Sequence, residues 1–132
     1  MLRMETILIV DDEAEVRSLA RDILLDSGYR VLEAENGEQA LRVADEQSDP
    51  IHLVLTDMVM PGIDGKQLAE RLAAARPYTK MIFMSGRAAE VMSDVGGLIS
   101  ADTFLAKPFT PERLLNKVRT RLEYRSPFSR QR

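Results

Sequence analysis

The chain has 132 residues, of which 45% are hydrophobic and 30% charged, and a formal net charge of −3, as expected for one globular domain with one core. It has no cysteine and a single histidine, His52, which excludes a disulfide framework, a thiolate metal site and a histidine metal cluster. The apolar run near its start is too short for a signal peptide or a membrane span, so we expect a soluble, cytoplasmic protein with no membrane partner.

Apolar runs of strand length alternate along the chain with segments of helical periodicity. The predicted strands lie at residues 6–10, 29–34, 51–55, 80–84 and 103–106. The first intervening segment has one apolar face, formed by Val16, Leu19, Ala20, Ile23 and Leu24. The runs ILIV and HLVL are apolar throughout rather than alternating, as in strands buried on both faces. The pattern predicts an α/β domain with a parallel sheet, helices on both faces and right-handed crossovers.

Local signals predict where some of the helices begin and where one is weak. Asp64 is the expected N-cap of the third helix, and Thr110 is that of the last helix. The fourth helical segment contains two adjacent glycines, Gly96 and Gly97, each costing roughly 1 kcal/mol relative to alanine in a helix interior. We therefore expect only a short helix at about residues 88–94, followed by an irregular link to the fifth strand.

Charge is unevenly distributed, because residues 107–132 carry eight basic and two acidic side chains whereas residues 1–106 carry 10 and 19. A basic end can indicate a nucleic-acid or lipid partner. Aromatic residues are only 5% of the chain, which argues against base stacking, and no DNA-binding element follows the last helix. We interpret the basic end as a solvated helix face with a tail at 124–132, expect one domain at 5–123, and expect no specific nucleic-acid binding.

The polar residues at the ends of the first, third, fourth and fifth predicted strands are the informative ones. Asp11 and Asp12 follow the first, Asp57 ends the third, Ser85 the fourth and Lys107 the fifth. Because ligands of open parallel sheets bind beyond the carboxyl ends of the strands, these side chains should converge at one edge. Clustered carboxylates repel one another, and a hard cation such as Mg²⁺ relieves that repulsion.

A pocket of acids with a cation, a lysine and a hydroxyl suits phosphoryl transfer, which depends mainly on positioning and charge neutralisation. The chain has no serine–base pair for acyl transfer and no GxxxxGK[ST] loop for a nucleoside triphosphate. Each residue alone has a structural interpretation: the Asp11–Asp12 pair as a helix N-cap, Ser85 as a turn residue, and Lys107–Pro108 as an ordinary loop. The functional interpretation depends on their coincidence at one edge.

The motifs ILIVDDE, LTDMVMPGIDG, FMSG and FLAKPF, in this order, resemble the receiver domain of bacterial two-component response regulators. The resemblance covers about residues 5–123, and the segments SGRAAEV and FLAKPFTPERLLNKVR are most similar to receivers of hybrid sensor histidine kinases. It implies a flavodoxin-like fold of five parallel strands in the order 2-1-3-4-5. It also implies a cytoplasmic phosphorelay protein, not a separate enzyme, that catalyses only its own phosphorylation and dephosphorylation.

The resemblance also implies roles for individual residues. Asp57 would be the phosphoacceptor, taking a phosphoryl group from a phosphohistidine. Asp12, Asp57 and the backbone carbonyl of Val59 would bind Mg²⁺, with Mn²⁺ as a substitute, and Asp11 would act through a metal-bound water. Ser85 and Lys107 would hold phosphoryl oxygens. Phe104 would be the aromatic switch residue, able to change its burial but lacking a hydroxyl for an outward hydrogen bond, and the peptide before Pro108 would be cis.

The implied partner is a histidine kinase or a phosphotransfer domain. The implied output surface consists of the fourth helix, the fifth strand and the fifth helix, which could also support self-association. Two alternatives stay open at this point. A metal-dependent phosphohydrolase with an aspartyl nucleophile would need an acid two residues after Asp57, where the chain has Val59. A docking-only pseudo-receiver would have lost an acid or Lys107, and neither is lost.

Overall fold

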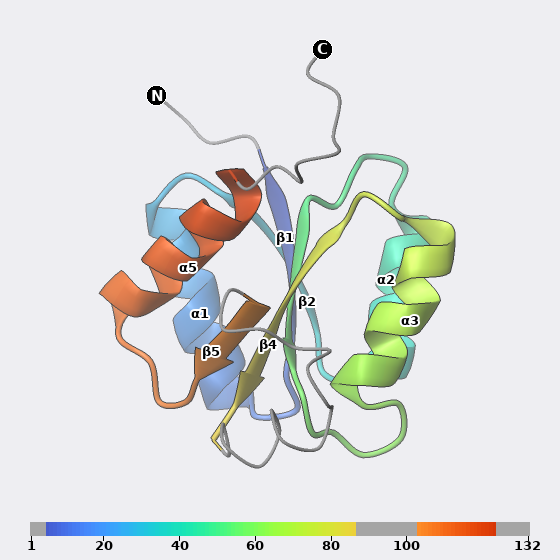
Figure 1. Cartoon of the computed structure of the whole chain (residues 1–132), viewed down its shortest axis with the longest axis horizontal. Coiled ribbons are helices and arrows are strands. Elements are labelled where there is room, and N and C mark those ends of the chain that lie inside the picture. Colours follow the sequence, from blue (N-terminus) through green and yellow to red (C-terminus); the bar gives the residue numbers. More distant parts are fainter. Residues whose placement is uncertain (1–4, 87–102, 124–132) are drawn as a thin grey trace.

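The apolar runs form one parallel sheet in the order β2-β1-β3-β4-β5, which confirms the predicted fold class (Figure 1). The structure is a computed structural model that describes residues 5–86 and 103–123, so the expected helix at 88–94 and the tail at 124–132 lie outside the described residues. The strands are β1 (Thr6–Val10), β2 (Arg30–Ala34), β3 (Leu53–Asp57), β4 (Lys80–Ser85) and β5 (Phe104–Ala106). The described helices are α1 (Ala14–Asp26), α2 (Gly37–Glu46), α3 (Gly65–Ala75) and α5 (Pro111–Glu123).

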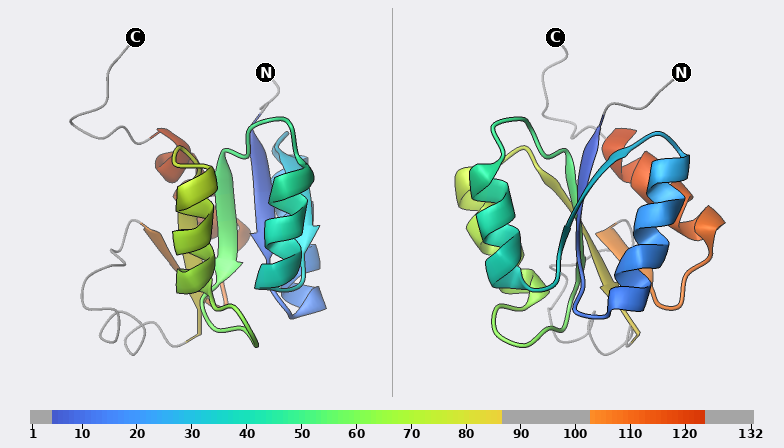
Figure 2. Two further views of the ribbon diagram at one scale, coloured as in Figure 1. Left: turned by 90° about the vertical axis from the view of Figure 1, so that its right-hand side faces the viewer. Right: turned by 180° about the vertical axis from the view of Figure 1, so that it is seen from behind.

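Helices cover both faces of the sheet, with α1 and α5 on one side and α2 and α3 on the other (Figures 1 and 2). Side chains of β1 alternate between two apolar clusters: Ile7 and Ile9 pack with residues of α1 and α5, and Leu8 and Val10 with residues of α2 and α3. This two-sided burial explains why the run is apolar throughout. Within the described ranges, no helix has the length and apolar character needed to cross a bilayer.

The bounds of β3 and the buried face of α1 differ from the sequence prediction. β3 begins at Leu53, two residues later than predicted, and continues through Thr56 to Asp57, because Asp57 still pairs in register with Met84 of β4. Leu19 was expected on the buried face of α1 but is 49% exposed, since the fully buried positions of that helix are Ala20 and Leu24. The first difference places Asp57 inside the hydrogen-bonded strand and thereby fixes its backbone.

The predicted N-caps are confirmed. The side chain of Asp64 accepts a hydrogen bond from Gln67 N at 2.8 Å, and the Gln67 side chain accepts one from Asp64 N at 3.0 Å, which completes a capping box at the start of α3. Thr110 Oγ1 accepts from Arg113 N at 3.1 Å at the start of α5. These caps set the direction in which each helix leaves the edge of the sheet where the acidic residues lie.

Gly65 allows the start of α3 to approach the end of β3 closely. Its N–H donates to the carbonyl of Met58 at 3.0 Å, and a Cβ at this position would lie 2.7 Å from the backbone oxygen of Asp57. No real Cβ contact is that short, and the neighbour is backbone rather than a flexible side chain. A side chain at residue 65 would therefore push the strand end that carries Asp57.

We expect Gly65→Ala to lower the free energy of unfolding by about 1–3 kcal/mol, the usual cost of overpacking a close contact. Gly86→Ala is the matched control, because a Cβ at Gly86 meets nothing within 4 Å. Urea denaturation of both variants measures the difference. Equal stability of the two variants would contradict a close approach at Gly65.

Candidate functional site

Three carboxylates meet at the carboxyl ends of β1 and β3. These strands are neighbours, and Val10 pairs with Thr56, so the acids that follow those positions lie side by side. One ligand oxygen from each of Asp11, Asp12 and Asp57 lies within 4.8 Å of the others. Asp11 is fully buried and Asp57 is 8% exposed, whereas Asp12 is exposed to solvent. The convergence predicted from the sequence is therefore present for the three acids.

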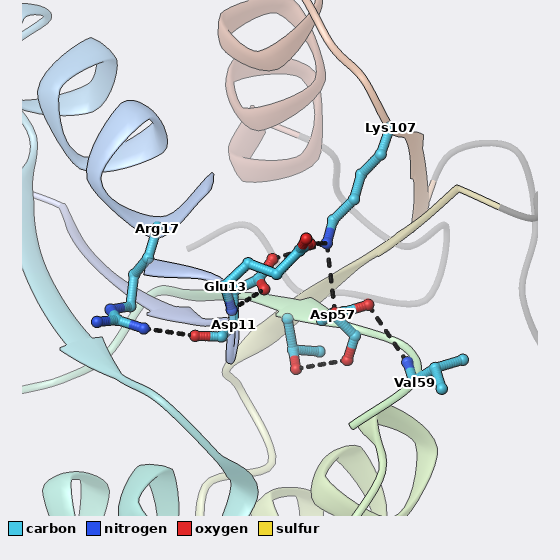
Figure 3. A network of polar contacts seen from close by, with 7 residues as sticks. Asp11, Glu13, Arg17, Asp57, Val59 and Lys107 are labelled. Atoms are coloured by element: carbon cyan, nitrogen blue, oxygen red, sulfur yellow. Dashed lines mark hydrogen bonds and ion pairs between the residues drawn. The ribbon is translucent and has the colours of Figure 1, made fainter. Parts of the chain in front are cut away.

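Lys107 brings a positive charge into this cluster from the end of β5 (Figure 3). Its Nζ lies 2.8 Å from Asp11 Oδ2, 3.3 Å from Asp57 Oδ2 and 3.2 Å from Glu13 Oε1. Its backbone N–H donates to the carbonyl of Ser85 at 2.9 Å, and the peptide to Pro108 is cis as expected. The end of β5 is thus hydrogen-bonded to the end of β4. The Lys107 side chain extends past β4 to Asp57 at the end of β3 and to Asp11 after β1.

Asp11 is held from several sides. Its Oδ1 accepts a hydrogen bond from Glu13 N at 2.9 Å, and its backbone carbonyl accepts one from Arg17 Nη1 at 2.7 Å. Arg17 is itself paired with Glu33 of β2 at 3.3 Å. One oxygen of Asp11 therefore accepts a hydrogen bond in the turn before α1, while the other faces Lys107. Neither aspartate is the N-cap that the structural interpretation of the pair expected, because the N-cap residue of α1 is Glu13.

The second carboxylate oxygen of Asp11 fits a bound cation. Oδ2 is buried and accepts no hydrogen bond within the described residues, although the Lys107 ammonium lies 2.8 Å away. A buried carboxylate oxygen that accepts no hydrogen bond is unusual, and oxygen atoms are the ligands that Mg²⁺ prefers.

The environment shifts the pKa of two groups. Burial raises the pKa of Asp57, and the nearby charge of Asp11 adds to the rise, which the attraction to Lys107 only partly offsets. Burial alone would lower the pKa of Lys107, but contact with Asp11 and the charges of Asp57 and Glu13 outweigh it and raise the pKa. The lysine is therefore firmly cationic, and the Asp57 carboxylate gains from any further cation beside it.

The remaining predicted residues lie around the same strand ends. Val59 N donates to Asp57 Oδ1 at 3.3 Å, and Val59 is 65% exposed. Ser85 is buried at the end of β4. Phe104 is also buried, in a small cluster with Met58 and Phe83. Phe104 therefore has little burial left to gain.

Sequence reasoning missed two residues. Glu13 follows the two aspartates in the DDE run, and its carboxylate contacts Lys107, which lies 94 positions later in the chain. Arg17, one turn into α1, holds the Asp11 carbonyl. The DDE run hinted at Glu13, but no local signal could show where either side chain points.

Residues 7–119 match the response regulator receiver domain family, and the chain belongs to this family. The sensor kinase CckA of Brucella abortus (strain 2308) is 36% identical over 118 residues, covering 89% of this chain and 12% of CckA. The transcriptional regulatory protein CpxR of Escherichia coli (strain K12) is 36% identical over 128 residues, 97% of this chain and 53% of CpxR. The chain thus spans about half of CpxR and a smaller part of CckA.

Solved structures agree. The crystal structure of the receiver domain from the hybrid histidine kinase CckA is 37% identical with a TM-score of 0.74, covering 89% of this chain and 99% of that chain. The chemotaxis response regulator CheY4 of Vibrio cholerae is 26% identical with a TM-score of 0.77, and the match covers 89% of this chain and 98% of the CheY4 chain. The expected likeness to receivers of hybrid kinases is confirmed.

In chelator at neutral pH, we expect Asp57→Asn to unfold with a higher free energy than the wild type. Because the folded pKa of Asp57 is raised, the ionised carboxylate costs stability above that pKa, at about 1.4 kcal/mol per pKa unit. The advantage of the Asp57→Asn variant should shrink as pH falls through the folded pKa and vanish below the ordinary value of 3.8.

Urea denaturation across a pH series measures this difference, and Asp49→Asn, at an exposed acid outside the cluster, is the control. If the Asp57→Asn variant were less stable than the wild type at neutral pH, the pairing of Asp57 with Lys107 would outweigh the cost of burial.

Proposed function

We propose that this chain is the phosphoacceptor receiver of a two-component phosphorelay, in which Asp57 accepts a phosphoryl group from the phosphohistidine of a histidine kinase or phosphotransfer domain. The observation that carries the proposal is the convergence of three carboxylates within 4.8 Å of one another, with the Lys107 ammonium 3.3 Å from Asp57. Membership of the receiver family supports it. A carboxylate held at the end of a rigid strand is placed to act as a nucleophile.

The transfer step needs no other protein nucleophile. A carboxylate oxygen of Asp57 attacks the phosphorus, a new O–P bond forms, and the N–P bond to the donor imidazole breaks. The imidazole leaves with the bonding electron pair and takes up a proton. Hydrolysis ends the phosphorylated state: water attacks the phosphorus, the acyl phosphate O–P bond breaks, and inorganic phosphate leaves the regenerated carboxylate.

Asp12, Asp57 and the backbone carbonyl of Val59 would hold a Mg²⁺ ion, or Mn²⁺ in its place, and Asp11 would act through a metal-bound water. The buried Oδ2 of Asp11, which accepts no hydrogen bond from the described residues, supports a cation at this position. Such an ion, when bound, supplies positive charge that neutralises the carboxylates and the incoming phosphoryl oxygens.

Lys107 and Ser85 would hold the phosphoryl oxygens once Asp57 is modified. The lysine is within reach because its Nζ is already 3.3 Å from Asp57 Oδ2, and charge-assisted contacts of this kind are strong. Ser85 lies at the end of the neighbouring strand, one residue beyond Met84, the register partner of Asp57. Ser85 and Phe104 would be the residues that report the modification.

Ser85 and Phe104 belong to β4 and β5, so the signal would leave through β5 and α5, together with the predicted fourth helix at residues that lie outside the described ranges. Self-association through this surface stays a prediction. A phosphohydrolase is not favoured, because the residue two positions after Asp57 is Val59, which carries no acid.

Incubation with acetyl phosphate and Mg²⁺ should raise the intact mass by one phosphoryl group, and Asp57→Asn should abolish the gain because an amide is not such a nucleophile. Asp64→Asn is the matched control, since asparagine caps a helix as well as aspartate. Intact-mass spectrometry reads the outcome. Undiminished single-site labelling of the Asp57→Asn variant would show that another residue accepts the phosphoryl group.

Asp12→Ala should weaken Mg²⁺ binding by at least about tenfold, because even residues behind the direct ligands change metal affinity by that much. In chelator it should raise stability, because one of three mutually repelling carboxylates is removed. Glu15→Ala, at an exposed acid in the first turn of α1, is the control for net charge. Isothermal titration tests the effect on Mg²⁺ binding, and a thermal melt tests the effect on stability. An unchanged Mg²⁺ affinity would show that Asp12 is not a ligand of the ion.

A further inference from the structure

Glu13 is the N-cap residue of α1, but its side chain makes no capping hydrogen bond. Glutamate is not among the residues that favour this position, so local helix energetics do not explain its placement. Its carboxylate instead points toward the acidic cluster, where Oε1 lies 3.2 Å from Lys107 Nζ (Figure 3). The side chain thus acts on the lysine rather than on its own helix.

Lys107 is fully engaged in the resting protein. An ammonium has three N–H donors, and three carboxylates, those of Asp11, Asp57 and Glu13, lie within 3.3 Å of Nζ. The first two are 0% and 11% exposed in their side chains, whereas that of Glu13 is 63% exposed. Releasing a buried carboxylate leaves a desolvated charge unpaired, but releasing Glu13 lets water solvate it. Glu13 is therefore the partner that Lys107 can exchange at the lowest cost.

We propose that Glu13 is a positioning residue for Lys107, whose carboxylate competes with phosphoryl oxygens for the ammonium and so favours the unphosphorylated state. This inference rests on the proposed acceptance of a phosphoryl group by Asp57. When that group arrives, the ammonium turns from Glu13 to a phosphoryl oxygen and the glutamate moves into water. A contact present in only one of two states shifts the equilibrium toward that state.

A general charge effect must be separated from this contact, because a glutamate near the pocket also repels an anionic phosphoryl group through space. Two variants separate them. Glu13→Gln removes both the charge and the ion pair. Glu13→Asp keeps the charge but is one methylene shorter, so the carboxylate falls short of an ammonium that Asp11 and Asp57 hold in place.

The affinity of the full chain for beryllofluoride, a phosphoryl mimic, at saturating Mg²⁺ tests the proposal. We expect both Glu13→Gln and Glu13→Asp to bind the mimic about two- to fivefold more tightly than the wild type, the range for a partly exposed ion pair. Glu15→Gln, which changes the same charge two residues away, should bind it like the wild type. Melting in chelator verifies that all variants are folded.

The outcomes are distinct. If the wild type does not bind the mimic at all, the proposed function fails. If the wild type binds the mimic but Glu13→Gln binds it no more tightly, Glu13 does not compete for Lys107. The same conclusion follows if Glu15→Gln binds the mimic as tightly as Glu13→Gln does. If Glu13→Gln is tighter while Glu13→Asp equals the wild type, only the local charge matters and the contact plays no part.

Discussion

Mutual repulsion between carboxylates is the constraint around which this domain is built. Asp11 and Asp57 are buried at the ends of adjacent strands, and burial together with the nearby charge of Asp11 raises the pKa of Asp57. In the resting protein the Lys107 ammonium lies between them, and its own pKa is raised by their charge despite its burial. The acidic cluster therefore carries excess negative charge that one lysine only partly neutralises, and a divalent cation or a phosphoryl group can change its charge balance.

The sheet makes this arrangement possible by fixing the backbone on which the charges sit. β1 and β3 are buried on both faces by apolar clusters, and Asp57 is still in register with Met84 when the strand ends. A rigid parallel sheet cannot separate its strand ends to relieve repulsion, because that would break its hydrogen-bond ladder and its core together. The repulsion between the carboxylates therefore persists at the edge of the sheet, where a bound ligand can reduce it.

Most of the fold could be predicted because it follows from short-range patterns. The continuous apolar runs marked the strands, Asp64 and Thr110 marked helix starts, and the acids after β1 and at the end of β3 marked one edge of the sheet. The exposure of Leu19 could not be predicted, because a helical stripe does not show how wide the buried face is. The contact of Glu13 with Lys107 was equally hidden, since it depends on where two flexible side chains meet across 94 residues.

Chemical trapping of the phosphorylated chain tests the central claim, that Asp57 is the acceptor, most directly. Borohydride reduces the acyl phosphate of an aspartate to homoserine, so peptide mapping after labelling with acetyl phosphate and Mg²⁺ identifies the modified residue. Homoserine at position 57, with Asp11 and Asp12 unchanged, is the predicted result. Homoserine at position 11 or 12, or phosphate retained on a residue that borohydride does not reduce, would contradict the account.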